Sequence, residues 1–537
     1  MSQAVSPTAP LPPSPPRPIA ETITPGLRAI VTITVMAATI MEVLDTSIVN
    51  VALPNMQGQL GATLDDIGWV STGYIISNVI VLPLTGWLSD VFGRRKYLFY
   101  SVILFTLASF GCGISRSLGT LVTFRIIQGM GGAAFLSTAQ ATLVEIYPKH
   151  RQGFAQAMFG MGVVMAPTLG PTVGGFITDH YTWPWIFFVN VPVGILAAIL
   201  CFAYVPDSLA ASAPRRADFA GILLLAIGLG SLQTILERGE QEDWFEKPYI
   251  TALALTALFG GLAFVWWELN PRNKSPAVDL RVLANRNLAA GSAFATALGF
   301  GLYGSVLLIP QFLQRVQTHT AQQTGLLLLP GGIATAMMMP IIARMLTRFD
   351  PRFFIGAGMT ILGSSAVWLA HLLTLETPNS AIFWPLVMRG MGIGLQFVPL
   401  SIVALGTLKP NKVAEGAGLY NLFRQLGGSF GIAILATILD RRQKFHFDRL
   451  REHIDVGNGL VQQQLAAIKL RLAAAGYMPG DIDKAAQRIL GGNVMHHAFN
   501  LSFIDAFWAM GWICFSALLL LFLFQRAKNR GAAAAVH

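Results

Sequence analysis

The sequence predicts an all-α protein that crosses a membrane about fourteen times. Of its 537 residues, 53% are hydrophobic and only 12% are charged, whereas soluble domains carry roughly 25% charged residues. Apolar runs near the ~20 residues that a bilayer requires recur along the whole chain. An even number of spans places both termini on the same side of the membrane.

The apolar runs give the expected spans in chain order. These lie near residues 30–53, 67–87, 97–114, 119–142, 153–177, 185–205, 218–236, 250–267, 289–309, 323–343, 353–373, 381–405, 416–438 and 499–525. Residues 1–27 are rich in proline and predict a disordered tail, without the basic stretch and apolar core of a cleaved signal peptide. Residues 526–537 form a second tail.

Weak internal repeats divide the chain into two halves. Leu82–Arg95 aligns with Met339–Arg352, and Gln128-Gly-Met-Gly131 aligns with Arg389-Gly-Met-Gly392 at nearly the same offset. The repeats predict two six-helix bundles, residues 28–205 and 271–525, with two additional spanning helices in residues 206–270. Such halves around a midplane site are typical of transporters in which one bundle rocks against the other.

The distribution of basic residues predicts the orientation in the membrane. The formal net charge is +10. Sixteen Lys and Arg residues fall in loops after even-numbered spans, against four in the short loops after odd-numbered spans. By the positive-inside rule both termini are cytoplasmic. The positive charge therefore reflects membrane orientation, and no nucleic-acid partner is expected.

One connection is much longer than the others. Residues 439–498, between the last two spans, are expected outside the membrane, whereas typical connections have about 4–6 residues. Periodicity predicts a helix over Leu460–Gly476 and a second, short helix from Asp481 to Leu490. The segment is either a helical hairpin that caps the exit or a docking surface for an external partner protein.

Two carboxylates, Glu42 and Asp45, lie inside the first predicted span. A carboxylate at the centre of a bilayer costs at least ~2.5 kcal/mol, so such residues mark functional sites by default. Their i, i+3 spacing puts both on one face of the helix. Two acids that face one cavity can carry a proton, bind a cation or alternate between these roles, which predicts an ion-coupled transporter.

The fourth predicted span carries Arg125. Of the 37 Lys and Arg residues, only Arg125, Arg389 and Arg424 lie inside spans. A guanidinium at this depth requires a carboxylate, carbonyl groups or water, and Glu42 and Asp45 are the only acids well inside the first six spans. We expect Arg125 to keep these acids ionised until conformation or substrate separates them. The alternative is a static ion pair that steadies the bundle.

The connection between spans two and three reads Gly86-Trp-Leu-Ser-Asp-Val-Phe-Gly-Arg-Arg-Lys96. Gly93 permits a tight turn, and Asp90 can cap the next helix or pair with Arg94. Arg94 and Arg95 belong to a basic cluster that is expected to stay cytoplasmic. Together with Gly86, such a loop can latch two helices in one conformation and release them in another.

Span five contains Gly170-Pro171-Thr-Val-Gly174-Gly175. Small residues at four-residue spacing let helix backbones approach closely, and proline bends a helix. Ordinary small-residue packing explains the glycines, but it explains Gly-Pro followed by Gly-Gly less readily.

These motifs resemble those of the major facilitator superfamily. The connection after span two matches its G-x-L-x-D-x-x-G-R-R/K signature; Leu121–Ala133 resembles its R-x-x-Q-G segment, and Gly170–Gly175 resembles its antiporter motif G-P-x-x-G-G. Further segments are similar to fourteen-span drug:proton antiporters of the EmrB/QacA type, and the long connection is similar to the EmrB branch; these segments are Leu44–Pro54, Trp185–Gly194 and Glu237–Phe245. The resemblance implies a major facilitator fold with two additional inter-bundle helices.

The resemblance also implies a function, namely proton-coupled efflux of hydrophobic toxic compounds across a bacterial cytoplasmic membrane by alternating access. Asp45, Glu42 and Arg125 are its expected proton-coupling residues, although the family commonly has an uncharged residue where Glu42 stands. The proton motive force takes the place of a cofactor. A membrane-fusion adaptor and an outer-membrane channel are the implied partners. The alternative is a proton-linked uptake or export transporter for a specific metabolite on the same fold.

Other classes of protein fit the sequence less well. No G-x-x-x-x-G-K-[ST] loop supports an ATP-driven pump, and no metal-ligand cluster or nucleophile–base motif supports an intramembrane enzyme. Three cysteines in apolar spans argue against a disulfide framework. Polar residues in plausible spans are the candidate substrate-binding groups, namely Asn78, Gln128, Gln396, Asn421 and Arg424.

Overall fold

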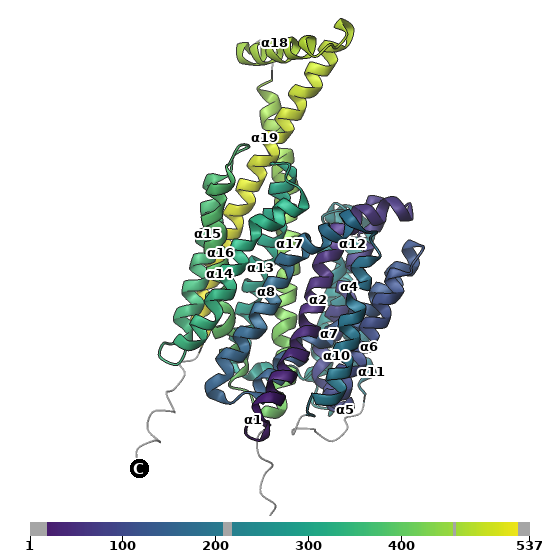
Figure 1. Cartoon of the computed structure of the whole chain (residues 1–537), viewed down its shortest axis with the longest axis vertical. Coiled ribbons are helices and arrows are strands. Elements are labelled where there is room, and N and C mark those ends of the chain that lie inside the picture. Colours follow the sequence, from purple (N-terminus) through teal and green to yellow (C-terminus); the bar gives the residue numbers. More distant parts are fainter. Residues whose placement is uncertain (1–18, 208–216, 455–457, 525–537) are drawn as a thin grey trace, which may run out of the picture.

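The computed structural model describes residues 19–207, 217–454 and 458–524, and the regular structure of these residues is entirely helical (Figure 1). Thirteen of the described helical segments are long and apolar enough to span a membrane. A further helix, α7 (Leu118–Ile146), carries Arg125, Gln128 and Gln140 and is largely buried in the first bundle. It corresponds to the predicted fourth span and completes the expected fourteen.

Six spans form the first bundle. They are α2 (Pro25–Leu60), the broken helix α4 (Trp69–Val81), η1 (Leu82–Leu84) and α5 (Thr85–Phe92), then α6 (Arg94–Gly113), α7, α8 (Gln152–His180), and α9 (Trp185–Phe188) with α10 (Asn190–Tyr204). The short helices are α1 (Ile19–Thr22), α3 (Leu64–Ile67) and η2 (Lys149–Arg151). Helix α1 and the start of α2 lie within the tail predicted to be disordered, whose first eighteen residues are outside the described part of the chain.

Sequence signals account for both ends of α2. Pro25 occupies the first turn, where its missing N–H costs no hydrogen bond. The hydroxyl of Thr24 accepts a hydrogen bond from the backbone N–H of Leu27. The helix ends at Gly61, whose φ of 60° is a conformation that glycine adopts readily.

Six spans also form the second bundle. They are α13 (Arg286–Arg315), α14 (Ala321–Met345), α15 (Pro351–Leu372), α16 (Asn379–Leu405), α17 (Val413–Glu452), and α19 (Pro479–Ser516) with η6 (Ala517–Leu523). The helices η4 (Leu280–Ala284) and η5 (Pro410–Lys412) lie in connections. Helix α8 packs along α14, and α4, η1 and α5 pack against α17. These two seams join the bundles.

The two additional spans, α11 (Phe219–Arg238) and α12 (Pro248–Leu269), are joined through η3 (Trp244–Glu246). They meet at glycines: a Cβ at Gly228 would lie 2.7 Å from the backbone nitrogen of Gly261. Helix α11 also packs against α4 and α17, and Gln233 donates a hydrogen bond to Ser429 at 2.8 Å. Helix α12 buries little of its surface within the chain, so it faces lipid.

The predicted external connection is largely helical and extends α17 and α19 beyond the bundles (Figure 1). The 40 residues of α17 measure about 60 Å at ~1.5 Å per residue, roughly twice the hydrocarbon thickness of a bilayer. Helix α18 (Gly459–Ala474) lies across the tip. We call the part of the chain from residue 439 to residue 498 the external hairpin.

The prediction of a separate helix from Asp481 to Leu490 is wrong. These residues begin α19, which runs unbroken from Pro479 to Ser516. Gly491 and Gly492 favour a break by about 1 kcal/mol each. Packing of α19 along α17 outweighs that cost, and Asp505 of α19 accepts hydrogen bonds from Arg442 at 2.5 Å and from His446 at 2.7 Å.

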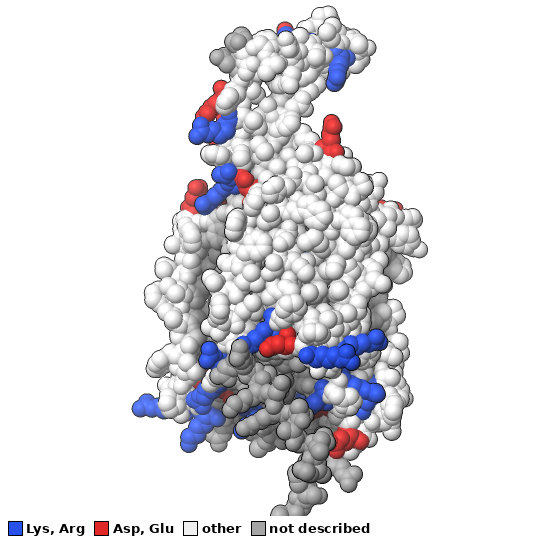
Figure 2. Space-filling model, turned by 90° about the vertical axis from the view of Figure 1, so that its left-hand side faces the viewer, with Lys and Arg blue, Asp and Glu red and all other residues white. Residues whose placement is uncertain are grey.

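Charged side chains are absent from the middle of the surface that Figure 2 shows. Figure 2 shows a broad band without Lys, Arg, Asp or Glu, with basic side chains gathered at the end opposite the external hairpin. Helix α1 lies at this basic end (Figure 1). A band without charged side chains is what a membrane-spanning surface requires.

Cys112, Cys201 and Cys514 are buried and form no disulfide bond.

The close approach of α8 to α2 generates a prediction about stability. A Cβ at Gly170 would overlap the hydroxyl oxygen of Ser47. We therefore expect Gly170→Ala to destabilise the protein by about 1–3 kcal/mol, seen as a lower Tm of the detergent-purified protein. Gly58→Ala, on α2 with nothing within 4 Å of its Cβ, is the control and should keep the Tm. Equal Tm values for the two variants would contradict this packing.

Candidate functional site

The centre of the first bundle holds a buried ion pair. Arg125 Nη1 of α7 donates to Asp45 Oδ2 of α2 at 2.6 Å, and neither side chain is more than 1% exposed. Arg125 Nε donates to the carbonyl oxygen of Val70 at 3.0 Å. The guanidinium carbon lies 4.2 Å from the centroid of the Tyr74 ring. The acid and the cation predicted from the sequence thus lie together, and each offsets the cost of burying the other.

Two amides complete the surroundings of Asp45. Gln128 Nε2 donates to Asp45 Oδ1 at 3.1 Å, and Gln128 Oε1 accepts from Arg125 Nη1 at 2.8 Å. Asn190 Nδ2 of α10 donates to Asp45 Oδ1 at 2.7 Å and to Ser109 Oγ at 3.2 Å. The carboxylate is thereby held by side chains from two other helices. The structure places Gln128, a predicted substrate-binding residue, in this ion-pair network.

Sequence reasoning missed Asn190 as a site residue. The signal was present, because Asn190 is a polar residue in an apolar span and lies in the segment Trp185–Gly194 that resembles the family. An amide in a span carries no charge, so no argument about charge compensation singled it out.

Glu42 lies one turn from Asp45 but has other partners. Its Oε1 accepts a hydrogen bond from Asn78 Nδ2 at 3.1 Å, while Oε2 has no hydrogen-bond partner among the described residues. Gly132 makes room here, since a Cβ at that position would lie 2.6 Å from the hydroxyl of Tyr74 and 3.4 Å from Glu42 Cγ. The two acids therefore occupy neighbouring but separate environments.

Polar side chains of α17 extend this region across the boundary between the bundles. Asn421 Nδ2 donates to Gln140 Oε1 of α7 at 2.8 Å, and Gln140 Nε2 donates to Gln156 Oε1 at 3.2 Å. Arg424 Nη2 donates to Asn421 Oδ1 at 3.4 Å, and Arg424 interacts electrostatically with Glu42. The predicted residues Asn421 and Arg424 thus share one polar region with Glu42.

Gln396 does not join this region. Its Nε2 donates to the carbonyl oxygen of Gly392 in the same helix at 3.2 Å. A Cβ at Gly358 of α15 would lie 3.0 Å from the Cβ of Gln396. Gln396 therefore packs within the second bundle, at the contact between α15 and α16.

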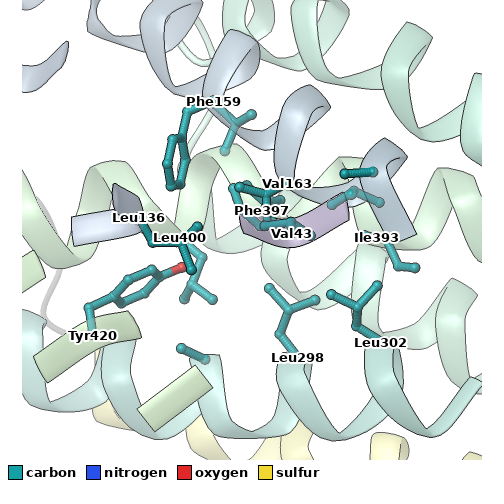
Figure 3. Close-up of a cluster of buried hydrophobic side chains, with 14 of the residues drawn as sticks. Val43, Leu136, Phe159, Val163, Leu298, Leu302, Ile393, Phe397, Leu400 and Tyr420 are labelled. Atoms are coloured by element: carbon teal, nitrogen blue, oxygen red, sulfur yellow. The ribbon is translucent and has the colours of Figure 1, made fainter. Parts of the chain in front are cut away.

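An apolar cluster lies at the same boundary (Figure 3). Its members are buried and come from both bundles: Val43, Leu136, Phe159 and Val163 from the first, and Leu298, Leu302, Ile393, Phe397, Leu400 and Tyr420 from the second. The ring centroids of Phe159 and Phe397 are 6.3 Å apart. Because Val43 follows Glu42 and Tyr420 precedes Asn421, the apolar and polar regions adjoin one another.

The motif between spans two and three brings α5 against α17. A Cβ at Gly86 would lie 2.8 Å from the Cα of Glu415, so glycine permits this contact. Lys412 Nζ donates to Glu415 Oε2 at 2.7 Å and to Asp279 Oδ2 at 2.8 Å. Burial acts to lower the pKa of Lys412, but the hydrogen bonds to the two carboxylates outweigh it and raise that pKa. Lys412 therefore stays charged and links three segments.

Of the two roles expected for Asp90, capping of the next helix is not what the structure shows. Gly93 occupies the N-cap position of α6 with a φ of 80°, and no side chain caps this helix. Arg94 instead forms an ion pair with Glu145 of α7. The backbone N–H of Arg95 donates to Asp207 Oδ1 at 3.2 Å.

The motif in span five packs behind the turn that carries Asp45. Pro171 has no N–H to offer the carbonyl of Pro167, and Ser47 Oγ of α2 donates to that carbonyl at 3.1 Å. A Cβ at Gly174 would lie 3.2 Å from the carbonyl oxygen of Ile48. Gly175 continues the motif, and its carbonyl accepts a hydrogen bond from the hydroxyl of Thr178.

A sequence profile described as the Major Facilitator Superfamily matches residues 35–432. The chain belongs to this superfamily. It is 35% identical over 441 residues to multidrug export protein EmrB of Escherichia coli strain K12, a match that covers 82% of this chain and 86% of that protein. It is 34% identical over 478 residues to fatty acid resistance protein FarB of Neisseria gonorrhoeae, covering 88% and 94%. The chain is thus a transporter of the EmrB type, a multi-pass protein of the inner membrane.

Solved structures show the same fold at low sequence identity. The human organic anion transporter MFSD10 superposes with a TM-score of 0.60 at 14% identity, covering 93% of this chain and all of that one. The proton:xylose symporter XylE superposes with a TM-score of 0.58 at 14% identity, covering 93% and 96%. The predicted major facilitator fold is confirmed, and these two structures bear on the fold alone.

The buried pair generates a prediction about stability. Arg125→Met leaves Asp45 buried without a cation, so we expect a loss of about 3–5 kcal/mol. The double variant Asp45→Leu/Arg125→Met removes both charges and should recover at least half of that loss. Thermal unfolding of the purified single and double variants measures both effects. Losses that simply add would show that the two side chains do not interact.

Proposed function

We propose that this transporter exports hydrophobic toxic compounds from the cytoplasm by alternating access, driven by the inward flow of protons. The observation that carries the proposal is the buried pair of Asp45 and Arg125 at 2.6 Å, with the Gly170–Gly175 motif packed behind the same turn of α2. The names of the relatives, which include multidrug export and fatty acid resistance proteins, support a toxic small molecule as cargo.

In this mechanism the two acids take protons when the site faces outward. A proton on Asp45 removes the charge that Arg125 Nη1 contacts at 2.6 Å, so the pair loosens and the bundles change conformation. Substrate entry from the cytoplasm then favours proton release on that side. A proton motive force of about 150 mV is worth ~3.5 kcal/mol per charge, which supports a gradient of a few hundredfold at one proton per substrate.

We also propose the orientation. The basic end of the molecule (Figure 2) would face the cytoplasm by the positive-inside rule. Both termini and the contact between Gly86 and Glu415 would then be cytoplasmic. The external hairpin would stand in the periplasm.

Export by everted membrane vesicles tests proton coupling. Wild-type vesicles should accumulate a fluorescent dye in a manner that an uncoupler abolishes. Asp45→Asn at equal protein level should lose this accumulation, because its side chain cannot exchange a proton at neutral pH. Glu42→Gln should lower it if both acids carry protons.

Unchanged uncoupler-sensitive export in Asp45→Asn would move the proton carrier to another residue. Proton-driven movement of substrate toward the cytoplasmic face would replace export with the alternative, an uptake transporter for a specific metabolite.

For the external hairpin we propose docking of a membrane-fusion adaptor that leads to an outer-membrane channel. The tip carries large apolar side chains in the open: Leu470 of α18 is 72% exposed and Met478, just before α19, is 75% exposed. Leu472 of α18 is buried, so α18 has an inner face and an outer face. An exposed apolar patch beyond the membrane band is typical of an interaction site.

Adding negative charge to this apolar patch tests whether the adaptor docks there. Leu470→Glu/Met478→Glu should weaken adaptor binding about tenfold or more and lower the drug resistance of intact cells that co-express the adaptor. Dye export by everted vesicles should not change, because it needs no adaptor. Gln464→Glu adds a charge at an exposed polar position of the same helix and should leave both readouts intact. An equal loss of vesicle export would indicate misfolding instead.

A further inference from the structure

Glu42 of the first bundle and Arg424 of the second are both buried, and both have hydrogen-bonding atoms without a partner in the described part of the chain. Glu42 Oε2, and Nε and Nη1 of Arg424, have no hydrogen-bond partner among the described residues. The two side chains are only 4% and 1% exposed. They interact electrostatically, but no hydrogen bond joins them at these atoms. Buried charges in this state are costly, and a ligand that pairs with both would remove the cost.

We propose that Glu42 and Arg424 together bind a zwitterionic substrate. The cationic group of the substrate, an ammonium, donates a hydrogen bond to Glu42 Oε2. Its carboxylate accepts a charge-assisted hydrogen bond from Nη1 of Arg424. This inference rests on the export function proposed above and specifies the class of substrate for the same region.

The surroundings suit the rest of such a molecule. The apolar cluster of Figure 3 adjoins the two charges and offers the rings of Phe159 and Phe397 from opposite bundles. Further buried polar atoms without partners among the described residues are the hydroxyl of Tyr420 and Nε2 of Gln156. A compact aromatic body with an ammonium at one end and a carboxylate at the other matches this combination.

Singly charged molecules fit the two groups less well. A cation bound to Glu42 lies in the field of Arg424, and an anion bound to Arg424 lies in the field of Glu42. Like charges repel more strongly where water is excluded. A zwitterion presents the complementary sign to each group, so both terms are favourable.

The arrangement also connects substrate to proton. The titratable and charged groups that interact with Glu42 are Asp45, Arg424 and Tyr74. Asp45 already forms an ion pair with Arg125, so Glu42 is the carboxylate that is available to an ammonium group. A proton on Glu42 removes the negative charge that the ammonium requires. Proton and substrate therefore compete for one side chain, as an exchanger requires.

Three probes with one aromatic body test the proposal: ciprofloxacin, a zwitterion; its methyl ester, a cation; and its N-acetyl derivative, an anion. Binding is measured by fluorescence titration of the full-length protein in lipid nanodiscs at neutral pH. Wild type should bind ciprofloxacin about tenfold or more tightly than either derivative, since a hydrogen bond to a charged group corresponds to a tenfold to hundredfold change.

Two variants test which protein side chain binds each charged group of the ligand. Arg424→Gln should remove the preference for ciprofloxacin over its ester, because the carboxylate loses its partner. Glu42→Gln should remove the preference over the N-acetyl derivative. Arg389→Gln is the matched control: Arg389 is another buried arginine of the second bundle, and it donates to Ser305 at 2.7 Å within that bundle. Its removal should leave the order of the three affinities unchanged.

Equal binding of the three probes by wild type, tighter binding of a derivative, or binding of none of them would overturn the proposal. Arg424→Lys provides a check against misfolding, since it retains the charge and should retain part of the preference. Dye export by everted vesicles separates this inference from the function beneath it. Uncoupler-sensitive export without a zwitterion preference refutes the substrate class alone, whereas loss of uncoupler sensitivity in wild type refutes the proposed function.

Discussion

The pairing of Asp45 with Arg125 is the interaction on which the first bundle depends. Two charges buried in the membrane interior each cost several kcal/mol unless they are paired and hydrogen-bonded. Here the pair draws its remaining hydrogen bonds from Val70 of α4, Gln128 of α7 and Asn190 of α10. Four helices must therefore converge on one point at hydrogen-bond distance. Because these four helices are held together by the Asp45–Arg125 pair, we expect them to move as one rigid body.

Freedom to move is consequently found at the seams between the bundles. The contacts there are small residues against backbone or side chain, such as Gly86 against Glu415 and Gly160 against Phe397. Small-residue contacts hold two helices closely without a network of charges that must be broken. The charged link at this seam, Lys412 with Glu415 and Asp279, joins segments on the second bundle's own side. Polar contacts also cross the boundary, namely the hydrogen bond from Asn421 to Gln140 and the interaction of Arg424 with Glu42, and these contacts change when one bundle rocks against the other.

Most of the fold could be predicted from the sequence, because a helix that spans the lipid bilayer must be about 20 residues long and mostly apolar. The expected spans correspond to helices of the structure. Arg125 could be paired with the two acids of the first span because few charges compete inside the spans, although among the described residues only Asp45 forms an ion pair with it. The sequence analysis missed the roles of Asn190 and Gln140, since a neutral amide imposes no need for a partner of opposite charge. The unbroken course of α19 depends on its packing along α17, a tertiary contact that local glycine signals oppose.

Glu42 shows what a second acid adds to such a bundle. Placed i−3 from Asp45, it shares the helix face but not the partners, because Arg125 lies against Asp45 and Asn78 against Glu42. The second oxygen of Glu42 has no hydrogen-bond partner among the described residues, and Glu42 interacts electrostatically with Arg424 from the other bundle. An acid inside one bundle can stabilise that bundle in every conformation. An acid whose counter-charge lies in the other bundle changes its surroundings whenever the bundles move, so its affinity for a proton or a cationic group must change with conformation. That dependence is what an exchanger requires.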